Sequence, residues 1–258
     1  MKRSAEISEA AGRTLIVTGG SRGIGAAVAQ QAAAAGFAVA VNYTQNEVAA
    51  ERVVHGIRSA GGVAHIFRAD IGVEADIVAL FEAAEATLGP IVGLVNNAGI
   101  TGKLTRVVAL DAADLARVMN VNVTGAFLCA REAVKRMSTK HGGAGGAIVN
   151  ISSIAARIGG AGEWVHYAAS KGAIETLTLG LAREVAAEGI RVNAVAPGLI
   201  ETEIHAAAGD PGRLERMAGG VPMARAGTAE EVAAAVLWLL SPAASYITGT
   251  VVDVGGGR

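Results

Sequence analysis

The sequence predicts a single α/β domain built on a doubly wound, mostly parallel sheet of about seven strands. Short, continuously apolar runs alternate with segments of helical length along the chain, which is the pattern of a parallel sheet covered on both faces. A glycine cluster separates the first apolar run from the first helix. No linker or repeat divides the 258 residues, and one α/β domain commonly reaches this length.

The first elements form a recognisable unit. The apolar run Thr14–Val17 meets glycines between positions 19 and 25, and the alanine-rich segment Ala26–Ala35 follows as a helix. Gly36 stands where a helix C-cap is expected. The apolar run Phe37–Val41 comes next, so the order is strand, glycine turn, helix and strand. This order predicts a βαβ unit.

The same alternation continues to the end of the chain. Further helices are expected around Glu47–Ala60, Glu74–Leu88, Ala112–Arg136, Ala168–Glu188 and Ala229–Leu240. Further strands are expected at Ala64–Arg68, Ile91–Val95, Ala147–Ile151, Arg191–Val195 and Thr250–Val254. We expect residues 1–12 to be a flexible terminal segment and residues 13–258 to form the domain.

The segment 202–228 lacks a clear period and is rich in glycine and proline. A loop this long inside a compact domain is usually functional. We interpret it as a mobile lid or substrate loop, and an irregular surface excursion is the alternative.

Composition excludes several classes of protein. The 52% of hydrophobic residues rules out intrinsic disorder. The net charge of −1, without long charged runs, and the 3% of aromatic residues argue against a nucleic-acid partner. One cysteine, Cys129, excludes an internal disulfide framework and fits a reducing compartment. The sequence has no secretory signal pattern and no apolar run of membrane-span length, so we expect a cytoplasmic protein without a membrane partner.

The glycine cluster Thr18–Gly25 reads TGGSRGIG and lies between a predicted strand and helix. Glycines let the backbone approach a pyrophosphate, whose charge is met by the helix N-terminus. The spacing differs from the G-x-G-x-x-G fingerprint, so a tight turn without a ligand is the alternative. The predicted cofactor contacts in this loop are Gly19, Ser21, Arg22, Gly23, Ile24 and Gly25.

Five further motifs stand in the order typical of short-chain dehydrogenases/reductases. They are Asn96-Asn-Ala-Gly99, Asn122-Val-Thr-Gly125, Ser153, Tyr167-Ala-Ala-Ser-Lys171 and Pro197-Gly198. With the glycine loop, the chain resembles this family from about Arg13 to Gly256. The resemblance implies a Rossmann-type domain and an enzyme that interconverts a carbonyl and a secondary alcohol of a small molecule with a nicotinamide cofactor. A non-catalytic sensor or scaffold on the same fold is the rival hypothesis.

Tyr167 and Lys171 are four residues apart, so on a helix they share one face. A tyrosine normally titrates near pH ~10. The lysine, with the charge of the oxidised nicotinamide, is expected to lower that pKa, so that Tyr167 transfers the proton. Taken alone, the pair is equally compatible with an ordinary helix surface. The resemblance implies that Lys171 also holds the nicotinamide ribose and that Asn122 positions a water relaying protons to Lys171; an asparagine that caps or kinks a helix is the alternative.

Ser153 follows the predicted strand Ala147–Ile151, at the carboxyl edge where open α/β sheets bind ligands. The resemblance gives it the role of steadying the substrate oxygen, and Ser152 is the competing residue. Ser153 and Tyr167 are 14 residues apart, one more than in the commonest form of the family. The addition falls within Gly159–Glu163 and is expected to change the contour of the substrate site, not the chemistry.

Two features favour NADP(H) over NAD(H) as cofactor. Asn42, Tyr43 and Thr44 follow the second strand without the acid that NAD-specific members generally place there. The guanidinium of Arg22 could clamp a 2′-phosphate. Dual use remains open. The other contacts that the resemblance implies are Asn42, Tyr43, Thr44, Asp70, Ile71, Asn97, Gly99, Tyr167, Lys171, Pro197, Gly198, Ile200 and Thr202; Asp70 could instead cap the following helix.

The remaining expectations concern metals, assembly and substrate. His166 has no partner at metal-ligand spacing, so we expect a surface or substrate-pocket histidine, a buried Cys129 and no metal site. Members of the family commonly form tetramers through the two long helices and the C-terminal segment, here Thr250–Gly257, so a homotetramer or homodimer is expected. The choice between a ketoacyl-carrier-protein reductase and an NAD-dependent sugar or polyol dehydrogenase stays open.

Overall fold

The structure, a computed structural model, describes residues 13–202 and 212–258. Its centre is a seven-stranded sheet in the order β3-β2-β1-β4-β5-β6-β7, and every neighbouring pair of strands is parallel. The strands are β1 (Thr14–Val17), β2 (Ala38–Tyr43), β3 (Val63–Arg68), β4 (Ile91–Asn96), β5 (Gly146–Ile151), β6 (Ile190–Pro197) and β7 (Val251–Val254). The predicted doubly wound sheet is confirmed.

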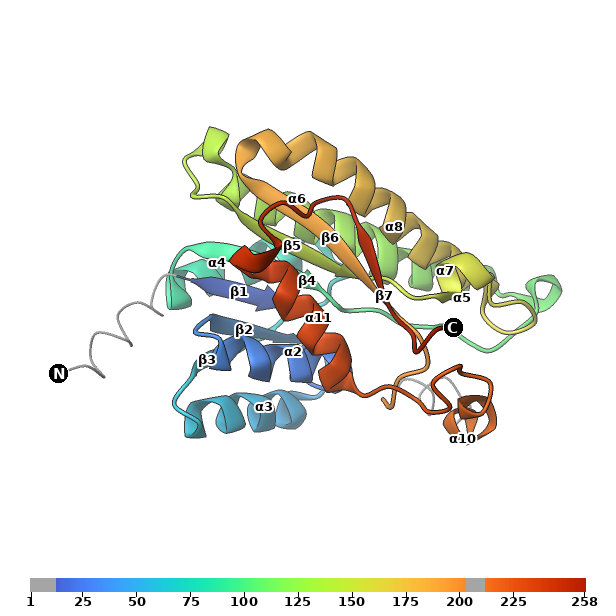
Figure 1. Cartoon of the computed structure of the whole chain (residues 1–258). Coiled ribbons are helices and arrows are strands. Elements are labelled where there is room, and N and C mark those ends of the chain that lie inside the picture. Colours follow the sequence, from blue (N-terminus) through green and yellow to red (C-terminus); the bar gives the residue numbers. More distant parts are fainter. Residues whose placement is uncertain (1–12, 203–211) are drawn as a thin grey trace.

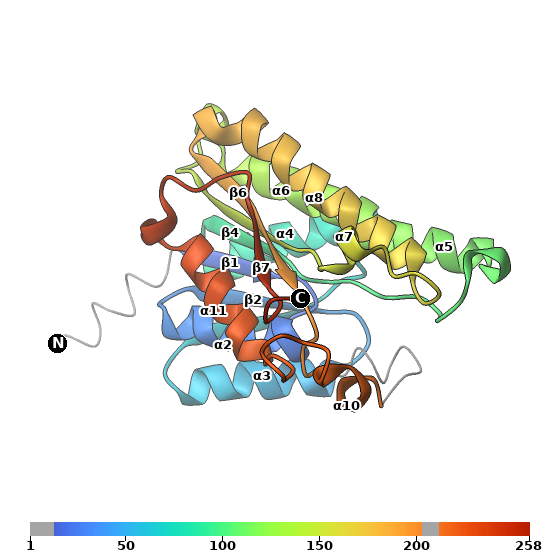
Figure 2. The same ribbon diagram turned by 45° about the vertical axis from the view of Figure 1, so that its right-hand side comes forward.

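Helices cover both faces of this sheet (Figures 1 and 2). The helices of the described residues are α2 (Gly23–Ala34), α3 (Glu47–Ser59), α4 (Glu74–Leu88), α5 (Ala112–Met119), α6 (Gly125–Met137), α7 (Ala155–Ile158), α8 (Val165–Val185), α10 (Arg213–Ala218) and α11 (Ala229–Leu240). The helices α2, α3 and α11 share one apolar core with the sheet, while α4, α6 and α8 share a second core on the opposite face. None of these helices is long and apolar enough to span a bilayer.

The strands separate these two cores by simple alternation. Leu15 and Val17 of β1 pack in the core of α2, α3 and α11, and Ile16 between them packs in the other core. Successive strand residues point to opposite faces. A central strand covered on both sides is therefore apolar at most positions, which explains the apolar runs in the sequence.

Three elements differ from the sequence-based expectation. The single helix predicted for residues 112–136 is interrupted by a π-helical turn, Asn120–Thr124, between α5 and α6. Helix α8 begins at Val165, before the expected start at 168, so that Tyr167 lies in its first turn.

The third difference concerns the segment 202–228. It contains α10, which sequence periodicity did not reveal. Residues 203–211 of this segment, like the expected flexible segment 1–12, lie outside the described residues. The described part packs through a small apolar cluster of its own: Leu199, Leu214, Met217, Ala218, Val221 and Ala226.

Candidate active site

A cavity of about 400 Å³ opens at the carboxyl edge of the sheet. Segments that follow β4, β5 and β6 line it together with α8 and α10. The predicted site residues in its wall are Ile24, Asn97, Gly99, Ser153, Tyr167, Lys171, Pro197, Gly198, Ile200 and Thr202. The predicted residues outside the wall are Gly19, Ser21, Arg22, Gly23, Gly25, Asn42, Tyr43, Thr44, Asp70, Ile71 and Asn122.

Tyr167 and Ser153 meet in this cavity. The hydroxyl of Ser153 lies close enough to the phenol of Tyr167 to influence its titration, and both residues line the cavity. Burial raises the pKa of Tyr167, and the Ser153 hydroxyl acts in the opposite direction. Without its cofactor the protein therefore has a raised Tyr167 pKa. The predicted lowering includes the charge of the oxidised nicotinamide and stays a prediction. The Lys171 ammonium, 5.6 Å from the centre of the Tyr167 ring, does not offset the desolvation.

The two adjacent serines have different surroundings. The Ser152 hydroxyl is buried and donates toward the Lys171 carbonyl (3.2 Å) and the Glu175 carboxylate (3.1 Å), so it is engaged with α8. Ser153 lines the cavity together with Tyr167, and its hydroxyl accepts from the Ala155 amide at 3.1 Å. The geometry favours Ser153 over Ser152 as the group that faces a substrate oxygen.

Lys171 is a buried cation. Its Nζ donates to the Ile151 carbonyl at 2.7 Å, and burial lowers the pKa of Lys171 to about 8. Gly99 faces it, since a Cβ at Gly99 would lie 3.5 Å from Nζ and 3.4 Å from Oδ1 of Asn122. Only glycine leaves this space between the lysine and the asparagine open.

Asn122 lies in the π-helical turn and binds the segment that follows β4. Its Oδ1 accepts from the Ile100 amide, and its Nδ2 donates to the Ile100 carbonyl, both at 2.8 Å. Nδ2 also donates to Oγ of Ser170 at 2.9 Å. The side chain of Asn122 thus joins the turn to α8 next to Lys171. A π-turn of this kind often marks a functional site.

The glycine loop needs its glycines. A Cβ at Gly25 would overlap the Gly19 carbonyl oxygen, and Gly19 has φ +62°, a conformation that favours glycine. The helix that follows has Arg22 as N-cap, without a side-chain cap and without an acid in its first turn. Thr202 lies directly against Gly23, so the segment after β6 borders the loop. The N-terminus of α2 therefore offers amide groups to an anion.

The predicted contacts at the end of β2 divide into buried and exposed ones: Asn42 and Tyr43 are the last two residues of the strand, and Thr44 follows it. Asn42 is buried and accepts from the Gly19 amide at 3.1 Å while donating to the Ala69 carbonyl at 3.0 Å. Tyr43 is buried as well, and Thr44 is exposed. The Asn42 side chain therefore links the glycine loop to the end of β3.

Asp70 is exposed and its Oδ1 accepts from the Gly72 amide at 2.8 Å. The N-cap of α4 is Val73, so the alternative that Asp70 caps this helix is wrong. Ile71, also predicted as a contact, is buried in the core.

His166 and Cys129 lie in the interior. The expectation of a surface or pocket histidine is wrong, because His166 is 4% exposed and its Nε2 lies 3.9 Å from Oδ2 of Asp114 behind Gly102. Cys129 is buried as expected, and burial raises the pKa of its thiol to about 12. Within residues 13–202 and 212–258 no group of three or more histidine, cysteine or acidic residues could hold a metal ion.

Sequence reasoning missed much of the cavity wall. These residues are Thr101, Ile151, Ile154, Ala155, Ile158, Gly160, Ala161, Glu163, Trp164, Leu199, Arg213, Met217 and Arg258. Their signal was indirect. Several stand in the segment with the extra residue before Tyr167, and two belong to α10 in the segment interpreted as a substrate loop.

Comparison with known proteins places this arrangement among oxidoreductases. The sequence profile of a family described as enoyl-(acyl carrier protein) reductase matches residues 19–258. An uncharacterized oxidoreductase, YgfF, of Escherichia coli is 56% identical over 94% of this chain and 98% of its own length. Glucose 1-dehydrogenase 2 of Bacillus subtilis is 39% identical over 95% of this chain and 94% of its own. The 3-oxoacyl-[acyl-carrier-protein] reductase of Staphylococcus aureus is 36% identical over 95% and 97%.

Proposed function

The chain belongs to the short-chain dehydrogenase/reductase family and is an oxidoreductase acting on CH–OH and C=O groups, and from this premise we propose that it uses NADP(H) and that Tyr167 transfers the proton. The observation that carries the catalytic part of the proposal is the meeting of Tyr167 and Ser153 in one cavity wall, next to the buried ammonium of Lys171.

The residues fit a dinucleotide. The glycine loop leaves no room for side chains at Gly19 and Gly25, and the uncapped N-terminus of α2 offers amide groups to phosphates. Gly23 and Thr202 border the path from this helix to the cavity with Tyr167. When bound there, the nicotinamide supplies or accepts the hydride.

The chain's own residues handle the oxygen and its proton. Ser153 donates a hydrogen bond to the substrate oxygen, and Tyr167 gives a proton to that oxygen in reduction or takes it in oxidation. Lys171 stands next to the ring and favours the phenolate when protonated. Tyr167 also lies in the first turn of α8, where the helix dipole stabilises negative charge. Asn122 supports this arrangement by joining the π-turn to α8 at Ser170.

The preference for NADP(H) is supported by the glycine loop and by β2. Arg22 is exposed at the N-cap of α2, where a 2′-phosphate would be accessible to its guanidinium. No acid stands between Asn42 and Thr44. The buried thiol of Cys129 supports the cytoplasmic location that forms part of this proposal.

The test is oxidation of NADPH, followed by absorbance, with a panel of ketones, aldoses and oxoacyl thioesters, and with the matching alcohols in reverse. Tyr167→Phe keeps the ring and removes only the hydroxyl, so turnover should fall by about 10²–10⁴-fold while cofactor binding survives. Turnover of Tyr167→Phe within a few-fold of wild type would contradict the mechanism and favour a sensor. The panel also separates the sugar-dehydrogenase and oxoacyl-reductase alternatives.

A further inference from the structure

An ion pair between distant parts of the sequence closes one wall of the cavity. Arg213, the first residue of α10, donates two hydrogen bonds to the carboxylate of Glu163, from Nη1 to Oε1 at 2.8 Å and from Nη2 to Oε2 at 2.7 Å. Only 11% of the Arg213 side chain is exposed, and both residues line the cavity. The paired fork is the strong geometry for arginine and a carboxylate.

Trp164 extends this contact toward the catalytic tyrosine. The guanidinium carbon of Arg213 lies 4.8 Å from the centre of the Trp164 ring, within the range of a cation–π interaction. Trp164 is buried, lines the cavity and is the N-cap of α8, three residues before Tyr167. We call the three residues Arg213, Glu163 and Trp164 the clasp.

Helix α10 needs such an anchor. It has six residues, and an isolated helix of this length is not stable in water. Its apolar side packs on a small cluster outside the two main cores, through Leu214 and Met217. Its first residue, Arg213, belongs to the clasp and is held by Glu163. The clasp also reaches the segment after β4, because the Glu163 carbonyl accepts from the Thr105 amide at 2.9 Å.

We propose that the clasp positions the substrate: Arg213 and Glu163 hold α10 and Trp164 in place as one part of the cavity wall. This positioning role rests on the proposed function, in which the substrate reacts at Ser153 and Tyr167. The two charges compensate each other, so this pair adds no net charge to the wall, and Trp164 and Met217 supply apolar surface beside it.

Tryptophan fluorescence tests the clasp without any substrate. The chain has two tryptophans, and the other, Trp238 on α11, is half-exposed and distant from the cavity lining. In a Trp238→Phe background, emission therefore reports on Trp164 alone. Glu163→Gln should shift this emission to longer wavelength and increase its quenching by acrylamide several-fold. The charge swap Glu163→Arg with Arg213→Glu should restore both toward the parent protein.

The matched control is Arg225→Gln. Arg225 also binds a glutamate with its fork, Glu231, with Nη1–Oε2 at 2.8 Å, and neither residue lines the cavity. This variant should leave Trp164 emission unchanged. Unchanged quenching in Glu163→Gln, or a swap that restores nothing, would overturn the proposal. If a single variant does not fold, the swap decides: recovery of both the fold and the low quenching supports the clasp, and failure to recover them refutes it.

Turnover separates positioning from a merely structural role. With any substrate accepted in the panel, Glu163→Gln should raise KM about tenfold, equivalent to about 1.4 kcal/mol, with kcat within a few-fold of wild type. A KM of Glu163→Gln equal to that of wild type would refute the proposal that the clasp positions the substrate. If the wild-type protein turns over no compound of the panel, the proposed function fails, while the fluorescence result still decides whether the clasp holds the wall.

Discussion

Lys171 combines a charge with almost complete burial, and this combination opposes stability. Burial lowers its pKa from 10.5 to about 8, a shift that corresponds to about 3 kcal/mol against the folded state when the group is charged. Its hydrogen bond to the Ile151 carbonyl returns about 1 kcal/mol. Active-site residues commonly reduce stability in this way.

Lys171→Met should therefore stabilise the fold at neutral pH by about 2 kcal/mol, or roughly 4–8 °C in Tm, while turnover is lost. Above the lowered pKa the folded protein has released the proton and the unfolded chain still holds it, so wild-type stability rises with pH. The advantage of the variant should be greatest below pH 8 and vanish as the pH approaches 10.5. Thermal unfolding of both proteins across this interval is the measurement, and a constant difference would contradict the assignment.

Arg22 is the residue on which the cofactor preference depends. Removing a guanidinium that binds a phosphate costs about 1.5–3 kcal/mol. Arg22→Ala should thus weaken NADPH binding by roughly 10–100-fold and leave NADH binding within about threefold. Titration of both cofactors against wild type and variant checks this, with NADH as the internal control. Equal losses of affinity for NADPH and NADH would show that Arg22 does not bind the 2′-phosphate.

At the scale of residues, the sequence predicted those whose chemistry requires a fixed spacing. Tyr167 and Lys171 had to be four apart to share a helix face, and the structure brings both to the cavity with Ser153. Trp164 and Arg213 carried no such signal. They are 49 positions apart and come into contact only because the chain folds, so no local pattern reveals the pair. The raised pKa of Tyr167 in the protein without cofactor carried no sequence signal either, since desolvation is a property of the surroundings.

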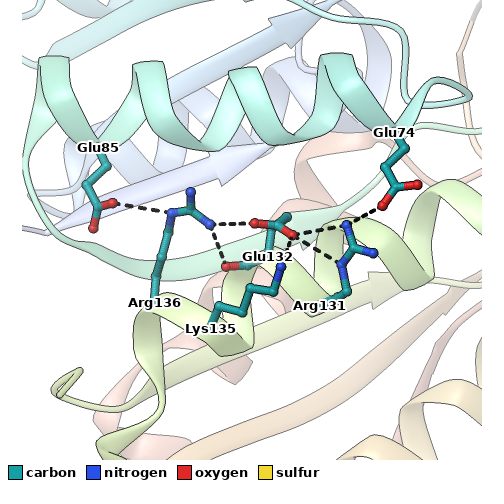
Figure 3. A network of polar contacts seen from close by, with 6 residues as sticks. All are labelled: Glu74, Glu85, Arg131, Glu132, Lys135 and Arg136. Carbon is teal, nitrogen blue, oxygen red and sulfur yellow. Dashed lines mark hydrogen bonds and ion pairs between the residues drawn. The ribbon is translucent and has the colours of Figure 1, made fainter. Parts of the chain in front are cut away.

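Helix α6 shows how an element is fixed by charge as well as by packing. The carboxylate of Glu132 is 3% exposed and accepts hydrogen bonds from Arg131, Lys135 and Arg136 of the same helix (Figure 3). Burial alone would raise the pKa of Glu132, but the bonds from Lys135 and Arg136 lower it. The sequence of this segment predicts a helix with several charges, but not that the carboxylate of Glu132 is buried among them.

The same cations reach the neighbouring helix. Arg131 pairs with Glu74 at 2.8 Å and Arg136 with Glu85 at 3.3 Å, so the cluster ties both ends of α4 to α6 (Figure 3). Arg136 also lies over the ring of Phe81 in α4, with its guanidinium carbon 5.4 Å from the ring centre.

Glu132→Gln should destabilise the protein by about 1–2 kcal/mol, because it removes the charge from a buried carboxylate whose partner cations can still reach solvent. Lys135→Gln is the control: its side chain is 57% exposed, and the loss should stay below about 1 kcal/mol. The Glu132 pKa is lowered, so its contribution is present above the ordinary carboxyl range and is lost as the pH falls through the lowered value. Urea unfolding at neutral and acidic pH checks both points. A difference that persisted below the lowered pKa would contradict the role of the charge.

Element boundaries were the part that periodicity predicted least well. The apolar stripe of residues 112–136 runs through the π-turn Asn120–Thr124, so the pattern alone gave one helix. The early start of α8 follows from Trp164 as N-cap, an apolar residue without a capping side chain, and sequence rules look for Ser, Thr, Asp or Asn there. Helix α10 is too short for its period to be recognised.

The molecule as a whole leaves one apolar helix face open. A groove of about 650 Å³ runs between α6 and α8, lined among others by Phe127, Leu177 and Leu181. Phe127 is 48% exposed, and Leu179 of α8 is 42% exposed. Gly172 and Gly180 add no bulk on α8, since a Cβ at either would meet nothing within 4 Å. An exposed surface of this kind favours association, and the assembly expected of the family uses these two long helices.

Phe127→Arg tests this assembly. If two copies pack their α6 and α8 faces together, the arginine is buried against its own symmetry mate, and a charge buried without a partner costs on the order of 3 kcal/mol. Association should weaken by roughly 100-fold, so that light scattering at micromolar concentration gives a smaller species than the wild-type dimer or tetramer. Val48→Arg, at a 70% exposed position of α3 on the other face of the sheet, should leave the mass unchanged. A wild-type protein that is monomeric would remove the proposed interface, and a Phe127→Arg variant of unaltered mass would place it elsewhere.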